Sequence, residues 1–114
     1  MKYFIHPAME RFRSFVETLP TTFDQGELIF QGRNTIRSFT IGDEKITVKR
    51  FRKPSGINAL LYGHLRKSKA QRAYEHAVEL CHLEIPTPEP IAWREDYAGG
   101  LLRDNYLITR YSDY

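Results

Sequence analysis

A short segment of alternating polarity, Glu44 to Phe51 (EKITVKRF), constrains the fold of this chain more than any other stretch. Successive side chains of a β-strand lie on opposite faces of the sheet. Ile46 and Val48 therefore share one face, whereas Lys49 lies on the other. The segment predicts a strand that buries an aliphatic pair on one side and presents a lysine on the opposite side.

The length and composition predict one domain without a membrane-spanning segment. With 114 residues, 41% of them hydrophobic, the chain can bury roughly 65% of its unfolded surface, which is enough for one core. No stretch approaches the roughly 20 apolar residues of a membrane span. The apolar run Tyr3 to Ile5 is also too short for the core of a signal peptide.

The charge and the cysteine content bear on partners and compartment. A net charge of +3 is a mild bias without a clear basic stripe, so we expect no nucleic-acid partner. Cys81 is the single cysteine, which excludes a disulfide within the chain and favours a reducing environment. We therefore expect a cytoplasmic protein, with peripheral contact with the inner membrane as the alternative.

The first 25 residues predict a short strand followed by an accessory helix. Lys2 to His6 has the pattern of a strand, and Pro7 then opens a helical pattern that Pro20 is expected to end. We expect residues 1–25 to cover one side of a sheet built by residues 26–114, within a single compact domain. The inward positions of the helix are expected to be Met9, Phe12, Val16 and Leu19.

The rest of the chain predicts an antiparallel sheet. A polar turn from Gly32 to Thr35 and a tight turn at Gly42-Asp43 separate three strands, the third of which carries Lys49. Two further strands follow near the end of the sequence. The five predicted strands are Leu28 to Gln31, Ser38 to Ile41, Glu44 to Phe51, Pro90 to Glu95 and Leu101 to Tyr111.

Between the third and fourth strands the sequence predicts two helices, which makes the fold class α+β. Ser68 and Gln71 form a capping box that starts the second helix, from about Lys69 to Leu83. The segment IPTPEP (Ile85 to Pro90) must be extended because of its prolines. The periodic apolar residues of the first helix are Ile57, Leu60, Leu61 and Leu65, and the expected buried side of the second is Ala73, Tyr74, Ala77, Leu80 and Cys81.

Four pieces of the sequence, in this order, carry a resemblance that covers nearly the whole chain. They resemble the bacterial lipopolysaccharide core kinase family, the Kdo and heptose kinases, and in particular the members found in gut anaerobes of the Bacteroides type. The resemblance implies a protein-kinase-like N-lobe, with a five-stranded antiparallel sheet, a C-type helix and, in this chain, an N-terminal accessory helix. The pieces are QGRN (Gln31 to Asn34), VKRF (Val48 to Phe51), RKSKAQRAYEHAVEL (Arg66 to Leu80) and IPTPEPIAW (Ile85 to Trp93).

The resemblance implies an ATP site centred on Lys49. This residue matches the strand-three lysine that contacts the α- and β-phosphates, and Glu75 matches the helix glutamate that pairs with it. A carboxylate on a packed helix fixes the flexible amine and keeps it protonated. Glu79, one helical turn later, is the alternative partner. Without the resemblance, Lys49 reads as a solvated lysine and Glu75 as a partner of Arg72 or Lys69.

The resemblance also implies the remaining nucleotide contacts. Gly32 belongs to the turn that would cover the phosphates, although the G-x-G-x-x-G pattern is absent. Arg33 and Asn34 are expected to act as side-chain donors in its place. Thr109 and Tyr111 are expected where the hinge begins, next to the adenine.

The implied activity depends on a second lobe. The catalytic Asp, the neighbouring Asn and the magnesium-binding Asp of such kinases belong to that lobe, and none follows Tyr114 in this sequence. We therefore expect the ATP-binding small lobe of a phosphotransferase, with weak nucleotide binding and no catalysis by this chain alone. Magnesium binding would require the second lobe, and whether the chain serves an enzyme is left open.

The alternative function is a non-catalytic interaction module or a truncated kinase relic. Such a protein would form a homodimer through the surface that otherwise faces the second lobe, around Leu101 to Tyr111 and the helix end near Leu83. Membrane association through the basic patch at Arg66, Lys67, Lys69 and Arg72 is a further alternative. A solvated basic turn is the favoured interpretation of that patch.

Overall fold

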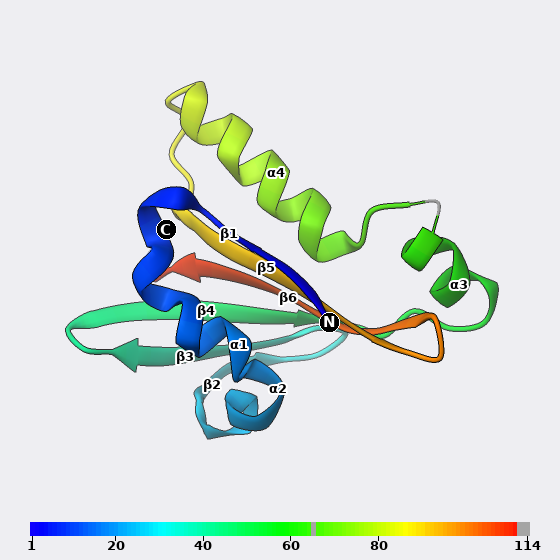
Figure 1. Ribbon diagram of the computed structural model, residues 1–114. Coiled ribbons are helices and arrows are strands. Elements are labelled where there is room, and N and C mark those ends of the chain that lie inside the picture. The colour runs from blue at the N-terminus through cyan, green and yellow to red at the C-terminus, as the bar shows by residue number, and fades with distance from the viewer. Residues whose placement is uncertain (65, 112–114) are drawn as a thin grey trace.

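The protein is built on one antiparallel sheet of six strands, as seen in a computed structural model that describes residues 1–64 and 66–111 (Figure 1). The order of the strands across the sheet is β1-β5-β6-β4-β3-β2. Helices cover both faces, which makes the fold α+β. The strands are β1 (Lys2–Ile5), β2 (Glu27–Gln31), β3 (Thr35–Ile41), β4 (Glu44–Phe51), β5 (Pro90–Ala98) and β6 (Leu101–Arg110).

The sheet contains one strand more than the five expected. The additional strand is β1, which pairs antiparallel with β5 from Lys2 opposite Glu95 to Ile5 opposite Ala92. The short first strand predicted at the N-terminus therefore extends the same sheet at its β5 edge. The other five strands occur where they were expected, with bounds shifted by a few residues.

The strand β4 has the predicted two-sided character. Ile46 and Val48 are fully buried on one face, in a core shared with Tyr106 and Ile108 of β6. Lys49 lies on the opposite face, which we call the Lys49 face. The alternation of β4 therefore confirms the prediction that one side of this strand is buried and the other presents the lysine.

The face opposite Lys49 is covered by residues 7–25, which we call the N-terminal helical segment. As predicted, Met9, Phe12, Val16 and Leu19 are buried. The expectation that Pro20 ends the helix is wrong, because Pro20 lies in the first turn of a new helix, where a missing amide costs no hydrogen bond. The segment consists of η1 (Pro7–Phe12), α1 (Arg13–Glu17), α2 (Leu19–Thr22) and η2 (Phe23–Gln25).

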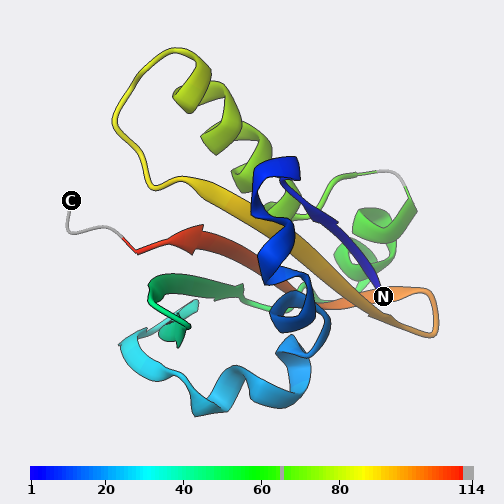
Figure 2. The same cartoon turned by 60° about the vertical axis from the view of Figure 1, so that its left-hand side comes forward.

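The Lys49 face is covered by the long helix α4 (Lys69–His82), which lies across the sheet from α1 and α2 (Figure 2). Its residues Ala70 and Tyr74 pack with Phe51 and Trp93 of the sheet. Cys81 is exposed, contrary to the prediction, because the last turn of α4 rises away from the sheet (Figures 1 and 2).

The helix α3 (Ile57–His64) precedes α4 and packs near β6. Ala59 of this helix is buried. Ile57 is 71% exposed, so the predicted apolar face is not fully buried. The side chain of Leu60 and the residue Leu65, both part of that prediction, lie outside the described residues. Within the described part of the chain, no helix has the length and apolar character needed to cross a membrane.

Candidate functional site

A cleft of about 270 Å³ lies between the Lys49 face of the sheet and α4, and we call it the Lys49 cleft. The strands contribute five of its lining residues, α4 contributes four, and the extended segment before β5 contributes two. Most of these side chains are apolar. They are Ile36, Thr47, Lys49, Leu107 and Thr109 from the strands, Ala73, His76, Ala77 and Leu80 from α4, and Thr87 and Pro88.

The register of β3, β4 and β6 places the cleft residues of the sheet next to one another. Lys49 lies opposite Ile36 of β3 on one side and opposite Leu107 of β6 on the other. Thr47 lies opposite Thr109 of β6, two residues along the strand from Lys49. Because residues two apart in a strand share a face, these five side chains form a continuous floor with one cation and two hydroxyl groups.

The ammonium group of Lys49 lies 5.0 Å from the centroid of the Phe51 ring, on the same face of β4. Such a cation–π contact contributes about 0.5–1 kcal/mol at an exposed site. Among the residues that the structure describes, no carboxylate forms an ion pair with Lys49. Its charge therefore remains available to an anionic ligand in the cleft.

The expected pair between Lys49 and Glu75 is not formed in this structure. Glu75 instead accepts hydrogen bonds from Lys67 Nζ at 2.8 Å and from Gln71 Nε2 at 3.2 Å. The hydrogen bond from Lys67 holds the pKa of Glu75 below its usual value. Glu79, the alternative partner, is exposed and also makes no ion pair with Lys49 within the described residues.

The orientation of α4 explains why Glu75 does not pair with Lys49. Successive residues of a helix are turned by about 100°, so Glu75 and the next residue, His76, lie on different parts of the helix surface. His76 lines the cleft together with Ala73 and Ala77, and Glu75 does not. No motif in the sequence marks His76 as a site residue, and the packing of α4 on the sheet identifies it as a cleft residue.

The turn Gly32 to Asn34 does not line the Lys49 cleft. The side chain of Asn34 accepts a hydrogen bond from the Arg52 amide at 2.9 Å, so it holds the turn against the end of β4. Gly32 lies against the Phe30 ring, and a Cβ atom at this position would come within 2.9 Å of that ring. Arg33 lines a separate cavity beyond the end of β4.

The two residues expected near the adenine are placed differently from each other. Thr109 lines the Lys49 cleft, opposite Thr47. Tyr111 does not line it: its ring lies 4.0 Å from Lys45 Nζ, and its amide donates to the Lys45 carbonyl at 3.0 Å. Of the expected nucleotide-binding residues, Lys49 and Thr109 thus share one cleft.

The second cavity has a volume of about 250 Å³ and is strongly basic. It lies where the Gly32 turn, the end of β4, the start of α3 and the start of α4 meet. Four cations line it, with neutral groups between them. The lining residues are Arg33, Arg52, Lys53 and Lys69, together with Pro54, Ser55, Asn58, Leu102 and Asn105.

The surface proposed for self-association carries exposed apolar side chains. Leu83 is 62% exposed, Ile85 46% and Tyr111 41%. A second exposed apolar group lies on the edge strand β2, at Leu28 and Phe30.

No group of three or more His, Cys, Asp or Glu side chains is placed to hold a metal ion within residues 1–64 and 66–111. Comparisons of the chain with protein-family models, with curated proteins and with solved structures gave no significant match.

Proposed function

We propose that the protein binds ATP in the Lys49 cleft, as the small lobe of a phosphotransferase that resembles the lipopolysaccharide core kinases. The observation that supports this proposal best is the placement of Lys49. Its ammonium group has no carboxylate partner among the described residues, and it borders a cleft that is otherwise lined mostly by apolar side chains. Such a cleft with one charged group is the usual form of a small-molecule site.

The lining residues suggest how a nucleotide would lie. The flat adenine ring would occupy the apolar part, between Ile36 and Leu107 on the sheet and Ala77 on α4. The hydroxyl group of Thr109 would be available to the polar edge of the base. Lys49 would then contact a phosphate, as a point charge that suits a phosphate oxygen.

Glu75 takes part in this proposal only if it exchanges partners. Its present pair with Lys67 is solvated, with side-chain exposures of 57% for Lys67 and 44% for Glu75. Exposed pairs of this kind contribute about 0–1 kcal/mol, so the exchange would cost little. In the arrangement described here, nucleotide binding depends on Lys49 without Glu75.

The proposal is tested by nucleotide binding to the Lys49→Ala variant, measured by calorimetric titration with ATP. We expect the affinity to fall by at least about tenfold, because a hydrogen bond to a charged group contributes roughly 1.5–3 kcal/mol. Lys45→Ala is the matched control, since Lys45 lies on the same strand but outside the cleft. This control should bind ATP like the unaltered protein.

Two results would contradict the proposal. Equal ATP affinity of the unaltered protein and Lys49→Ala would remove the site assignment. A protein that binds no nucleotide, but forms dimers that Leu83→Glu dissociates, would instead support the interaction module.

A further inference from the structure

We propose that the second cavity is an anion site that binds a phosphate monoester and is separate from the Lys49 cleft. We call this cavity the basic pocket and define it by Arg33, Arg52, Lys53 and Lys69. The inference does not depend on nucleotide binding by Lys49.

The basic pocket is assembled from three segments that hydrogen bonds hold together. Arg33 comes from the turn between β2 and β3, which the Asn34 side chain attaches to the Arg52 amide at 2.9 Å. Lys69 is the first residue of α4, whose start is attached to β6 because Asn105 Oδ1 accepts a hydrogen bond from the Ala70 amide at 3.0 Å. These hydrogen bonds fix the backbone positions of the segments that carry the cations.

The charge of the basic pocket is largely uncompensated. Asp104 lies 3.8 Å from Lys53 Nζ and lines an adjoining cavity that shares Arg33, Arg52 and Lys53 with the pocket. For Arg33, Arg52 and Lys69, the described part of the chain provides no ion-pair partner. Cations gathered without counter-charges repel each other, so an anion bound among them would be stabilised.

The shape and chemistry of the pocket suit a phosphate monoester. The planar guanidinium groups of Arg33 and Arg52 can each donate two hydrogen bonds to phosphate oxygens, and Lys69 adds a point charge. Ser55 and Asn58 provide neutral polar groups that suit the hydroxyl groups of a small molecule carrying the phosphate. The volume of about 250 Å³ favours a small ligand over a polymer.

The basic pocket and the Lys49 cleft are distinct sites. They share no lining residue. Between Lys49 and Arg52 along β4 lies Phe51, which is only 8% exposed and packs with Tyr74 and Trp93. A ligand in one cavity therefore leaves the other accessible.

The test is calorimetric titration with glucose 6-phosphate and with inorganic phosphate, and with glucose as the uncharged control. We expect saturable binding of both phosphates, weakened by added salt, and no binding of glucose.

The double variant Arg52→Ala/Lys69→Ala should lose at least about tenfold in affinity for the phosphates. Both side chains are exposed, so the fold should be retained. Arg103→Ala, at an exposed position of β6 and outside all three cavities, should bind as the unaltered protein does.

Further measurements separate this site from the nucleotide site and identify the source of the phosphate. Lys49→Ala should keep its affinity for glucose 6-phosphate even if ATP binding is lost. Two kinds of vesicle, one containing phosphatidic acid and one of phosphatidylcholine alone, distinguish a lipid headgroup from a soluble monoester. If the ligand is a lipid headgroup, the protein should be retained only on the vesicles that contain phosphatidic acid. The double variant should not be retained on either kind. The proposal is overturned if no phosphate-bearing probe binds, if the double variant binds equally well, or if Lys49→Ala loses its affinity for glucose 6-phosphate.

Discussion

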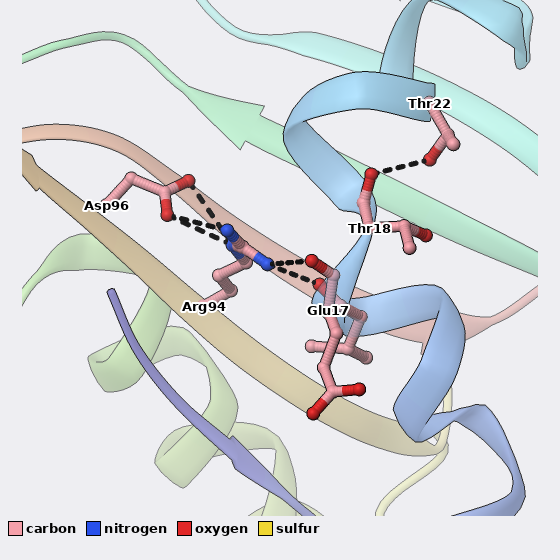
Figure 3. A network of polar contacts seen from close by, with 6 residues as sticks. Glu17, Thr18, Thr22, Arg94 and Asp96 are labelled. Atoms are coloured by element: carbon pink, nitrogen blue, oxygen red, sulfur yellow. Dashed lines mark hydrogen bonds and ion pairs between the residues drawn. The ribbon is translucent and has the colours of Figure 1, made fainter.

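Arg94 is a buried cation that joins the sheet to the N-terminal helical segment (Figure 3). Its Nη1 donates to the carbonyl oxygens of Val16 and Glu17, each at 2.8 Å. Its Nη2 donates to Asp96 Oδ1 at 2.9 Å. The guanidinium thus donates to carbonyl groups of the last turn of α1, and a carboxylate balances its charge.

Replacing Arg94 with methionine should strongly destabilise the protein. The substitution removes a buried donor from two carbonyl groups and from the Asp96 carboxylate. We expect a loss of roughly 3 kcal/mol in the free energy of unfolding, at the lower end for a broken buried pair because the Asp96 side chain stays 22% exposed. Urea unfolding followed by circular dichroism measures this change.

Arg13→Met is the matched control for this substitution. Arg13 pairs with Glu10 on the surface, where an ion pair contributes about 0–1 kcal/mol. The two variants lose the same side-chain charge, so their difference reports the burial of Arg94. Equal destabilisation by both would show that the Arg94 contacts do not hold the segment to the sheet.

The sequence predicts which side chains face the core on the strands and on α4, but it does not predict which polar residue of α4 lies near Lys49. The alternation of β4 fixes that Lys49 lies opposite Ile46 and Val48, because the period of a strand allows only two faces. On α4 the apolar pattern places Tyr74 and Ala77 on the buried side, as the structure confirms, but it does not specify which polar neighbour lines the cleft. The resemblance implied Glu75 as the cleft residue of α4, whereas α4 turns His76 toward the cleft.

The start of α4 is an element whose position was predictable from local sequence. Ser68 accepts a hydrogen bond from the Gln71 amide at 3.1 Å, as the capping box predicts. The reciprocal half of the box is replaced, because the Gln71 side chain donates to Glu75. A second cap comes from Asn105 of β6, a contact across 35 residues that no local pattern indicates.

Ser68→Ala should weaken α4 without disrupting the sheet. The substitution removes the acceptor for the Gln71 amide, which lies at a helix start where no intrahelical acceptor exists. We expect a loss of about 1 kcal/mol in the free energy of unfolding, measured by thermal denaturation. Ser14→Ala, at an exposed position in α1, is the control and should be close to neutral. A neutral Ser68→Ala would indicate that Asn105 alone fixes the start of the helix.

Long-range pairing explains the element-scale features that sequence reasoning missed. The strand β1 was recognised, but its place beside β5 joins Lys2 to Glu95, and loop closure over such a distance leaves no local signal. The new helical turn at Pro20 is favoured by the core, since Leu19 and Phe23 on either side of it are both buried. Burial of these side chains continues the helical segment past a residue that normally ends one.

At the scale of the whole molecule, residues 1–25 and 26–114 share one core. The side chains packed on the face opposite Lys49 come from both parts of the chain, since Phe12, Val16 and Leu19 belong to the same buried cluster as Ile46 and Ile108. Neither part encloses these residues by itself. The boundary at residue 25 therefore separates two regions of the sequence and not two units of the hydrophobic core.

Removing residues 1–25 should abolish folding of the remaining chain. The deleted part supplies the buried side chains Ile5, Met9, Phe12, Val16, Leu19 and Phe23. At about 1.5–3 kcal/mol for each, their loss removes roughly 9–18 kcal/mol, which equals or exceeds the total stability of a typical domain. We expect residues 26–114 alone to show no cooperative thermal transition.

A synthetic peptide of residues 1–25 should restore the transition when added, and the same peptide with Val16→Asp and Leu19→Asp should not. Cooperative unfolding of residues 26–114 alone would show that the sheet and α4 hold a core without the N-terminal helical segment.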